Sequence, residues 1–163
     1  MNKLGAMPVL QPVRIPTKDM GWFKSMGRWL FGTRKWMFAE DWYYELEDDI
    51  LVHIPQGFII DGASIPKIFW SLLSPTGILL IPGCIHDFAY QYGFLWMREV
   101  NGQLIKFGAK KKRKYWDRMF RDIAIRTNGF KVINRSAYYA LRAGGWHTWR
   151  KYRKADKVLE VKV

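Results

Sequence analysis

Residues 83–127 constrain the fold more than any other stretch, because a sharp turn signal separates two helical patterns. Asn101-Gly102 stands between two short runs of alternating apolar residues. Both residues accept the positive φ angles of a tight turn, so the dipeptide predicts a β-hairpin. The stretch is therefore expected to hold a helix over 83–94, strands over 96–98 and 103–107, and a helix over 109–127.

The second of these helices carries one apolar stripe. Its large apolar residues recur at i, i+3, i+4 and i+7, which places them on one face: Trp116, Met119, Phe120 and Ile123. Asn128-Gly129 should end the helix, with Gly129 in the left-handed conformation that closes many helices. We expect this face to pack on the core.

The other segments predict a mixed chain. Strands are expected over 36–44, 50–54 and 58–60, an acidic turn over 45–49, and short helices over 66–73 and 136–143. The order predicts an α+β fold in which a small antiparallel sheet is followed by the helix–hairpin–helix unit and a basic C-terminal helix or tail. We expect an extended arm over 1–20, one domain over 21–145, and a basic, aromatic tail over 146–163.

Charge and composition narrow the classes of protein. The 163 residues carry a net charge of +13, and the first fifty are balanced, so the excess belongs to residues 51–163. Such a surface favours polyanions: nucleic acid, anionic lipid or an acidic protein. No run approaches the roughly twenty apolar residues of a membrane span, and the N-terminus lacks the pattern of a secretion signal. Cys84 is the only cysteine, which suits a reducing cytosol.

The residues that suggest chemistry lie in the first predicted helix of the unit. His86 and Tyr90 are four apart and share a face, whereas Asp87 points about 100° away. An imidazole can act as a general base, and it works better when an acid fixes its tautomer. Of the two acids on the next helix, Asp117 is favoured over Asp122 because it lies nearer the core. A buried histidine bonded to a backbone carbonyl would account for the same residues without catalysis.

Two segments concentrate positive charge. Five consecutive cations open the predicted helix over 109–127, where the helix dipole disfavours them: Lys110, Lys111, Lys112, Arg113 and Lys114. Beyond Gly144-Gly145, indoles alternate with cations: Trp146, Trp149, Arg150 and Lys151. Such residues suit anionic lipid headgroups or single-stranded nucleic acid. A solvated tail with its rings docked on the core has the same composition.

Three segments, GFIIDGASIPKIFWSLLSPTG, IPGCIHDFAYQYG and YWDRMFRDIAIRTNG, together resemble a family of phage and prophage proteins catalogued as a domain of unknown function. The shared features are an Asp-x-Ala-Ser-Ile-Pro element, a His-Asp-x-x-Tyr helix and a later Asp-x-x-Phe helix, over about residues 55–130. The resemblance implies synthesis in a bacterial host cytoplasm, with the virion as an alternative location. It implies no activity.

The succession of a His-Asp-x-x-Tyr helix, a hairpin and an aspartate on a returning helix is also similar to the plan of phospholipase A2. That resemblance implies that His86 activates water and that Asp117 orients His86 with help from Tyr90. It also implies a Ca²⁺ ion bound by Asp87 and by oxygens of an upstream loop, where Asp61 is a further candidate ligand.

One segment departs from the phospholipase plan. Asp61-Gly62-Ala63-Ser64 replaces the glycine-rich calcium loop, and a turn followed by a helix cap would account for it. Three hypotheses follow. The favoured one is a Ca²⁺-dependent, phospholipase A2-like hydrolase of bacterial anionic lipid. The others are a non-enzymatic phage component, either part of the virion or tail or a host-directed binding protein, and a nucleic-acid binder.

Overall fold

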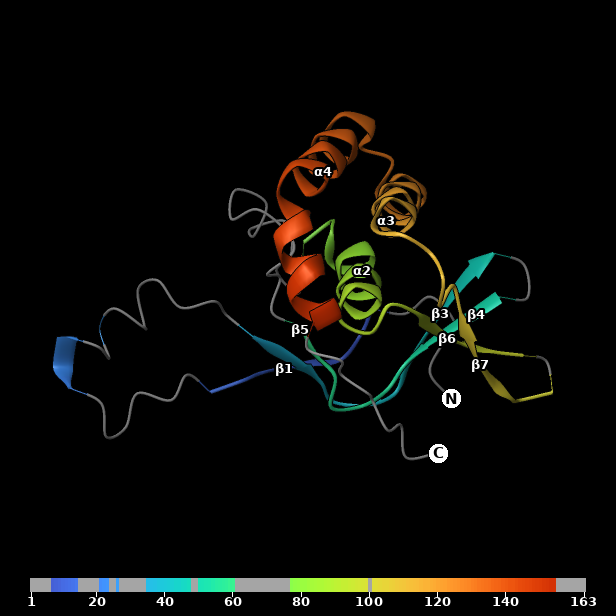
Figure 1. Cartoon of the computed structure of the whole chain (residues 1–163). Helices are drawn as coiled ribbons and strands as arrows, with labels where there is room; N and C mark the ends of the chain where they lie inside the picture. Colours follow the sequence, from blue (N-terminus) through green and yellow to red (C-terminus); the bar gives the residue numbers. More distant parts are fainter. Residues whose placement is uncertain are drawn as a thin grey trace.

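The structure is a computed structural model that describes residues 7–14, 21–23, 26, 35–47, 50–60, 77–99 and 101–154. The helix predicted over 66–73 lies outside the described residues. The described part has the predicted α+β fold, in which two antiparallel sheets are combined with helices α2, α3 and α4 (Figure 1).

Short strands form the two sheets. The first has the order β1-β2-β5, with strands Leu10–Pro12, Trp36–Phe38 and Ile59–Ile60. The second has the order β3-β4-β6-β7, with strands Trp42–Glu47, Ile50–Ile54, Leu95–Arg98 and Leu104–Phe107. The single strand predicted over 36–44 is wrong, because the chain bends after β2 and places β3 in the other sheet. The predicted arm contains β1, an edge strand that can hold Pro12 without losing a ladder hydrogen bond.

The predicted hairpin is confirmed as β6 and β7. The Gly102 N–H donates to the Glu99 carbonyl at 2.8 Å, and Gly102 has a φ of 85°. β6 also pairs with β4, with Val52 opposite Met97. The hairpin therefore extends the sheet that begins with β3 and β4.

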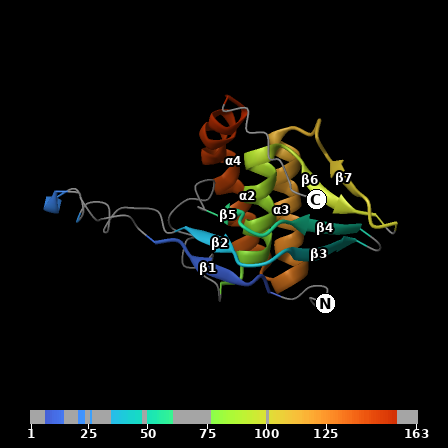
Figure 2. The ribbon, with the colours of Figure 1, turned by 90° about the horizontal axis from the view of Figure 1, so that it is seen from below.

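Helix α2, Leu80–Tyr92, is the central element, and every residue from Leu80 to Gln91 is buried. It begins three residues before the predicted helix. Pro82 is tolerated because the first turn of a helix has no internal partner for its N–H groups. Helices α3 and α4 pack against α2, as do β5 and β6 (Figure 2). Polar residues of α2 are thus surrounded by protein.

Helix α3, Arg113–Asn128, follows the hairpin and buries the predicted stripe at Trp116, Phe120 and Ile123. Gly129 ends it in the left-handed conformation, as predicted. The helix begins at Arg113 and not at residue 109, so Lys110, Lys111 and Lys112 precede it. The expected conflict with the helix dipole therefore applies to Lys112 at the N-cap and to Arg113 and Lys114 in the first turn, whereas Lys110 and Lys111 lie before the cap.

Helix α4, Lys131–Lys154, differs most from the sequence prediction. A short helix over 136–143 was expected to end before Gly144-Gly145, but α4 continues through both glycines to Lys154. Residues 146–154, expected in the tail, are the last turns of this helix. None of the helices in the described part of the chain has the length and hydropathy that a bilayer crossing requires.

Candidate active site

His86 of α2 and Asp117 of α3 meet in the interior, as predicted. His86 Nε2 lies 3.1 Å from Asp117 Oδ1, and both side chains are 0% exposed. The alternative acid, Asp122, is exposed and pairs with Arg121 at 2.7 Å. The choice of Asp117 over Asp122 as the partner of His86 is therefore confirmed.

Tyr90 supplies a second hydrogen bond to the same carboxylate oxygen. Its hydroxyl donates to Asp117 Oδ1, and its ring centroid lies 4.0 Å from that of His86. Burial and the nearby Asp117 charge raise the pKa of Tyr90 well above its ordinary value. The phenol therefore keeps its proton and remains a donor.

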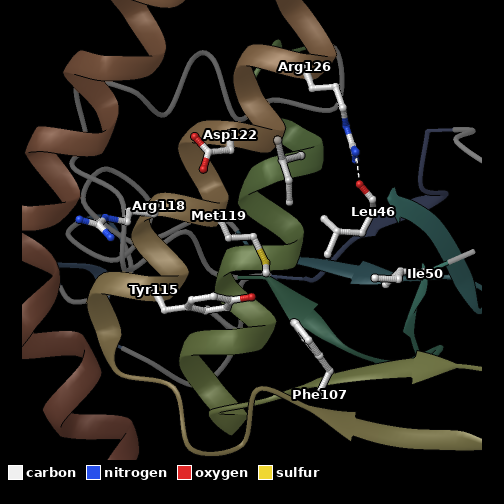
Figure 3. Close-up of a pocket in the computed structure, with 9 residues that line it drawn as sticks. Leu46, Ile50, Phe107, Tyr115, Arg118, Met119, Asp122 and Arg126 are labelled. Atoms are coloured by element: carbon white, nitrogen blue, oxygen red, sulfur yellow. Dashed lines mark hydrogen bonds between the residues drawn. The ribbon is translucent and has the colours of Figure 1, made fainter. Parts of the chain in front are cut away.

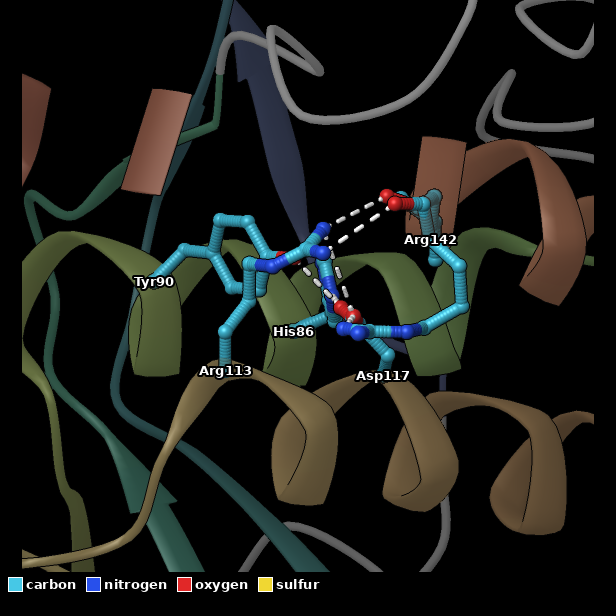
Figure 4. Close-up of polar contacts among 6 residues, drawn as sticks. His86, Tyr90, Arg113, Asp117 and Arg142 are labelled. Carbon is cyan, nitrogen blue, oxygen red and sulfur yellow. Dashed lines mark hydrogen bonds and ion pairs between the residues drawn. The ribbon is translucent and has the colours of Figure 1, made fainter. Parts of the chain in front are cut away.

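Two arginines bind the other oxygen of Asp117 (Figure 4). Arg142 of α4 donates from Nη1 to Asp117 Oδ2 at 2.7 Å, and Arg113 Nη1 lies 3.6 Å from the same atom. Arg113 also donates to the backbone carbonyls of Leu141 and Arg142, at 2.9 and 3.0 Å. The carboxylate thus joins α2, α3 and α4.

These contacts fix the charge of Asp117. Burial alone would raise the pKa of its carboxyl, but the hydrogen bonds from His86, Tyr90 and Arg142 outweigh burial and hold that pKa below its ordinary value. An ionised carboxylate can only accept hydrogen bonds. The facing nitrogen, His86 Nε2, must therefore carry a hydrogen, and in a neutral imidazole this leaves Nδ1 with the free lone pair.

The Nδ1 atom of His86 is buried and has no hydrogen-bond partner in the described part of the chain. Asp87, the next residue of α2, is also buried. Asp61, the other predicted metal ligand, lies outside the described residues. Among the residues that the structure describes, no group of three His, Cys, Asp or Glu side chains could hold a metal ion.

Gly145 brings α4 close to this cluster. A Cβ atom at this position would lie 2.8 Å from the Tyr90 hydroxyl and 3.3 Å from Arg113 Nη1. Real Cβ atoms do not approach other atoms closer than about 3 Å without displacement, so only glycine leaves room for the phenol here. The close contact with Tyr90 therefore explains why one of the two adjacent glycines of α4 stands at position 145.

A groove of about 530 Å³ lies between α3 and the second sheet (Figure 3). Its apolar wall is formed by Met119 and Ile123 of α3 together with Leu46, Ile50 and Phe107 of the second sheet. Arg126 at its edge donates to the Leu46 and Glu45 carbonyls. The lining includes no member of the His86 cluster, so the groove is separate from the candidate active site.

Comparison with known proteins identifies a family. Residues 36–141 match the family model described as a protein of unknown function, DUF1353. The chain belongs to this family. The DUF1353 match includes His86, Tyr90, Arg113 and Asp117, and it ends one residue before Arg142. No curated protein and no solved structure matches the chain.

The cationic and aromatic residues selected from the sequence divide into two groups in this DUF1353 protein. Outward positions are Lys110, Lys111, Lys112, Lys114, Trp146, Arg150 and Lys151. Arg113 points inward to α4, and Trp149 packs against the Tyr90 ring with centroids 5.2 Å apart. Anion binding at the outward positions stays a prediction.

Sequence reasoning missed three members of the cluster: Arg113, Arg142 and Gly145. Arg113 precedes Asp117 by four residues, a spacing at which opposite charges meet on a helix, so this pair could have been found. Arg142 and Gly145 reach the site only because α4 folds back over α2 and α3. No local pattern in the sequence signals that contact.

Proposed function

We propose that this protein is a phage-encoded, phospholipase A2-like ester hydrolase that acts on bacterial anionic lipid. One observation carries the proposal: the Asp117 carboxylate accepts hydrogen bonds from both His86 Nε2 and Tyr90. The carboxylate thereby fixes the tautomer that leaves Nδ1 as the base. The same three residue types have these roles in the phospholipase plan that the sequence resembles.

In this proposal the base is His86 Nδ1. It takes a proton from a water molecule as the water oxygen attacks the ester carbonyl carbon. Asp117 stabilises the imidazolium that forms, and Tyr90 holds the carboxylate in place. Nδ1–H then returns the proton to the leaving alkoxide as the carbon–oxygen bond breaks, so the products are a fatty acid and a lysolipid.

Ca²⁺ remains the expected cofactor, with Asp87 and Asp61 as expected ligands. Bound Ca²⁺ would polarise the ester carbonyl. Of the two expected ligands, only Asp87 lies among the described residues. The proton transfers of His86 do not depend on the metal. The phage or prophage origin, synthesis in the host cytoplasm and a place in the virion belong to the same proposal and rest on the sequence resemblance.

The test measures fatty-acid release from vesicles that contain phosphatidylglycerol, with Ca²⁺ present. We expect release by the wild-type protein, its loss with EDTA, and a decrease of about 10²- to 10⁴-fold for His86→Gln, the range that a general base contributes. Tyr90→Phe should decrease the rate less, because Asp117 would keep its bond to His86.

A matched control comes from the other buried histidine. His53 of β4 lies 3.5 Å from Asp41 and stacks on Tyr43, outside the His86 cluster. His53→Gln makes the same chemical change without touching that cluster, so the rate should stay near that of the wild type. Equal rates for wild type and His86→Gln, or no release with Ca²⁺, would refute the hydrolase and favour a purely structural cluster.

A further inference from the structure

The side of α4 that faces away from α2 and α3 carries a row of exposed apolar side chains. Val132 is 79%, Tyr139 68% and Trp146 49% exposed. They are seven residues apart, which is nearly two helical turns, so they lie along one line. Fourteen residues at about 1.5 Å each give the row a length of about 21 Å. These three residues are termed the α4 outer row.

The fold does not need the outer row for packing. The opposite side of α4 already buries Ala137, Leu141 and Gly145. Single exposed apolar residues are common on protein surfaces, and three of them aligned on one helix would offer a partner an apolar line. The outer row is therefore available to a partner.

Charge restricts the kind of partner. α4 contains seven Lys and Arg residues and no Asp or Glu. Arg135 and Arg150 are exposed beside the row, and the Arg150 guanidinium lies 5.2 Å from the Trp146 ring centroid. A second copy of the chain would bring two such helices together, and like charges would oppose that contact. An anionic partner meets no such opposition.

The side-chain types favour lipid among the anionic partners. Tryptophan and tyrosine settle at the headgroup level of a bilayer, an aliphatic side chain gains from the acyl region, and cations meet anionic headgroups. A nucleic acid could stack its bases on Trp146 and Tyr139. It would offer little apolar surface to Val132, the most exposed member of the row.

We propose that the α4 outer row, together with Arg135 and Arg150, docks this protein on an anionic phospholipid bilayer. This surface would bring the hydrolase proposed above to its lipid substrate, and that role rests on the proposed function. Arg142, which contacts Asp117, stands three residues after Tyr139 and four before Trp146. A bilayer on the outer row thus lies about one helical turn from a residue of the candidate active site.

Sedimentation with vesicles tests the docking surface. The full chain carries His86→Gln so that lipid is not consumed, and the vesicles contain phosphatidylglycerol with phosphatidylethanolamine, or phosphatidylcholine alone. We expect binding to the anionic vesicles and at least tenfold weaker binding to phosphatidylcholine. Replacing all three row residues by Ser should weaken binding more than tenfold. Arg135→Gln with Arg150→Gln should weaken it about 25-fold, since each cation near an anionic surface contributes about fivefold.

Two matched controls remove the same kinds of side chain elsewhere. Trp22 lies in the N-terminal region and is 68% exposed. Trp22→Ser therefore tests the loss of an exposed indole outside α4. Arg118 is exposed on α3 at the groove, and Arg118→Gln tests the loss of a cation away from α4. Each control should change binding less than about threefold. Far-ultraviolet circular dichroism should show the helix content of the His86→Gln parent in every further variant, because all the additional altered residues are exposed.

The outcomes separate the docking surface from the hydrolase. Vesicle binding by a protein that releases no fatty acid would support the surface and refute the hydrolase. Hydrolysis of a dispersed short-chain lipid without vesicle binding would refute the surface and leave the hydrolase standing. Wild-type affinity in the triple-Ser variant, or equal binding to both vesicle types, would also overturn the proposal. Binding of single-stranded DNA by a protein that binds no vesicles would overturn it as well.

Discussion

The two adjacent glycines of α4 predict opposite effects of the same substitution. A Cβ atom at Gly144 would meet nothing within 4 Å, whereas one at Gly145 would lie 2.8 Å from the Tyr90 hydroxyl. Tyr90 is buried and donates to Asp117, so it has little freedom to withdraw. Gly144→Ala should therefore stabilise the protein, and Gly145→Ala should destabilise it.

The magnitudes follow from three contributions. Alanine is favoured over glycine in a helix interior by about 0.8–1 kcal/mol, which is the whole expected gain for Gly144→Ala. For Gly145→Ala, overpacking opposes that gain by about 1–3 kcal/mol. Displacement of Tyr90 weakens a hydrogen bond to a charged group, at about 1.5–3 kcal/mol. The net loss for Gly145→Ala should be about 1.5–5 kcal/mol, which is about 2.5–6 kcal/mol relative to Gly144→Ala.

Thermal and urea unfolding of the two variants measure this difference. At about 2–4 °C per kcal/mol for a chain of this size, the two midpoints should differ by roughly 10 °C. Tyr90→Phe provides a second check, because removal of the hydroxyl relieves the close contact. Gly145→Ala should therefore cost less in the Tyr90→Phe background than in the wild type. Equal midpoints for the two alanine variants would refute the packing of Tyr90 against α4.

Three other contacts predict measurable effects. The pKa of Asp117 is lower in the folded chain than its ordinary value of 3.8, so its stabilising contribution is complete above about pH 5 and is lost as the pH falls. Asp117→Asn should flatten that part of the stability–pH curve, as measured by urea unfolding. Burial raises the pKa of Cys84, so a thiol reagent should label it only after unfolding. Arg153 donates to the Tyr90 and Gln91 carbonyls at 2.9 and 2.8 Å, so Arg153→Gln should lower the unfolding free energy by about 1–2 kcal/mol.

Each of these effects has its own control. Asp122→Asn, at an exposed carboxylate, should leave the acid limb of the stability curve unchanged. Lys154→Gln should leave the unfolding midpoint within about 1 °C of the wild type. Rapid labelling of Cys84 in the native protein would contradict its burial in α2.

The features that sequence reasoning found are those with a local cause. Asn101-Gly102 accepts the backbone angles of a tight turn wherever it occurs, and the stripe on α3 has a helical period of its own. The contact of His86 with Asp117 followed from these two predictions, because a helix that returns across a short hairpin can bring its buried side to the preceding helix. His86 could thus be paired with Asp117 before any contact was visible.

The features that sequence reasoning missed depend on distant packing. Each glycine in a helix interior costs about 1 kcal/mol, so Gly144-Gly145 was expected to end the last helix. Packing against Tyr90 and Arg113 outweighs this cost, and neither contact can be predicted from residues 131–154 alone. The assignment of β2 and β3 to different sheets has the same origin, since it is decided by their pairing with β5 and β4.

The charges around Asp117 support a role beyond stability. Burying a carboxylate and parts of two guanidinium groups has a large desolvation cost, and replacement of such clusters by apolar residues is often neutral or stabilising. The cluster therefore contributes little net stability, although loss of one member leaves a buried charge without its partner. What an apolar core could not supply is an ionised acceptor that fixes the tautomer of His86. Because Arg142 belongs to α4, the helix that carries the proposed docking surface also contributes a contact to the carboxylate that orients the proposed base.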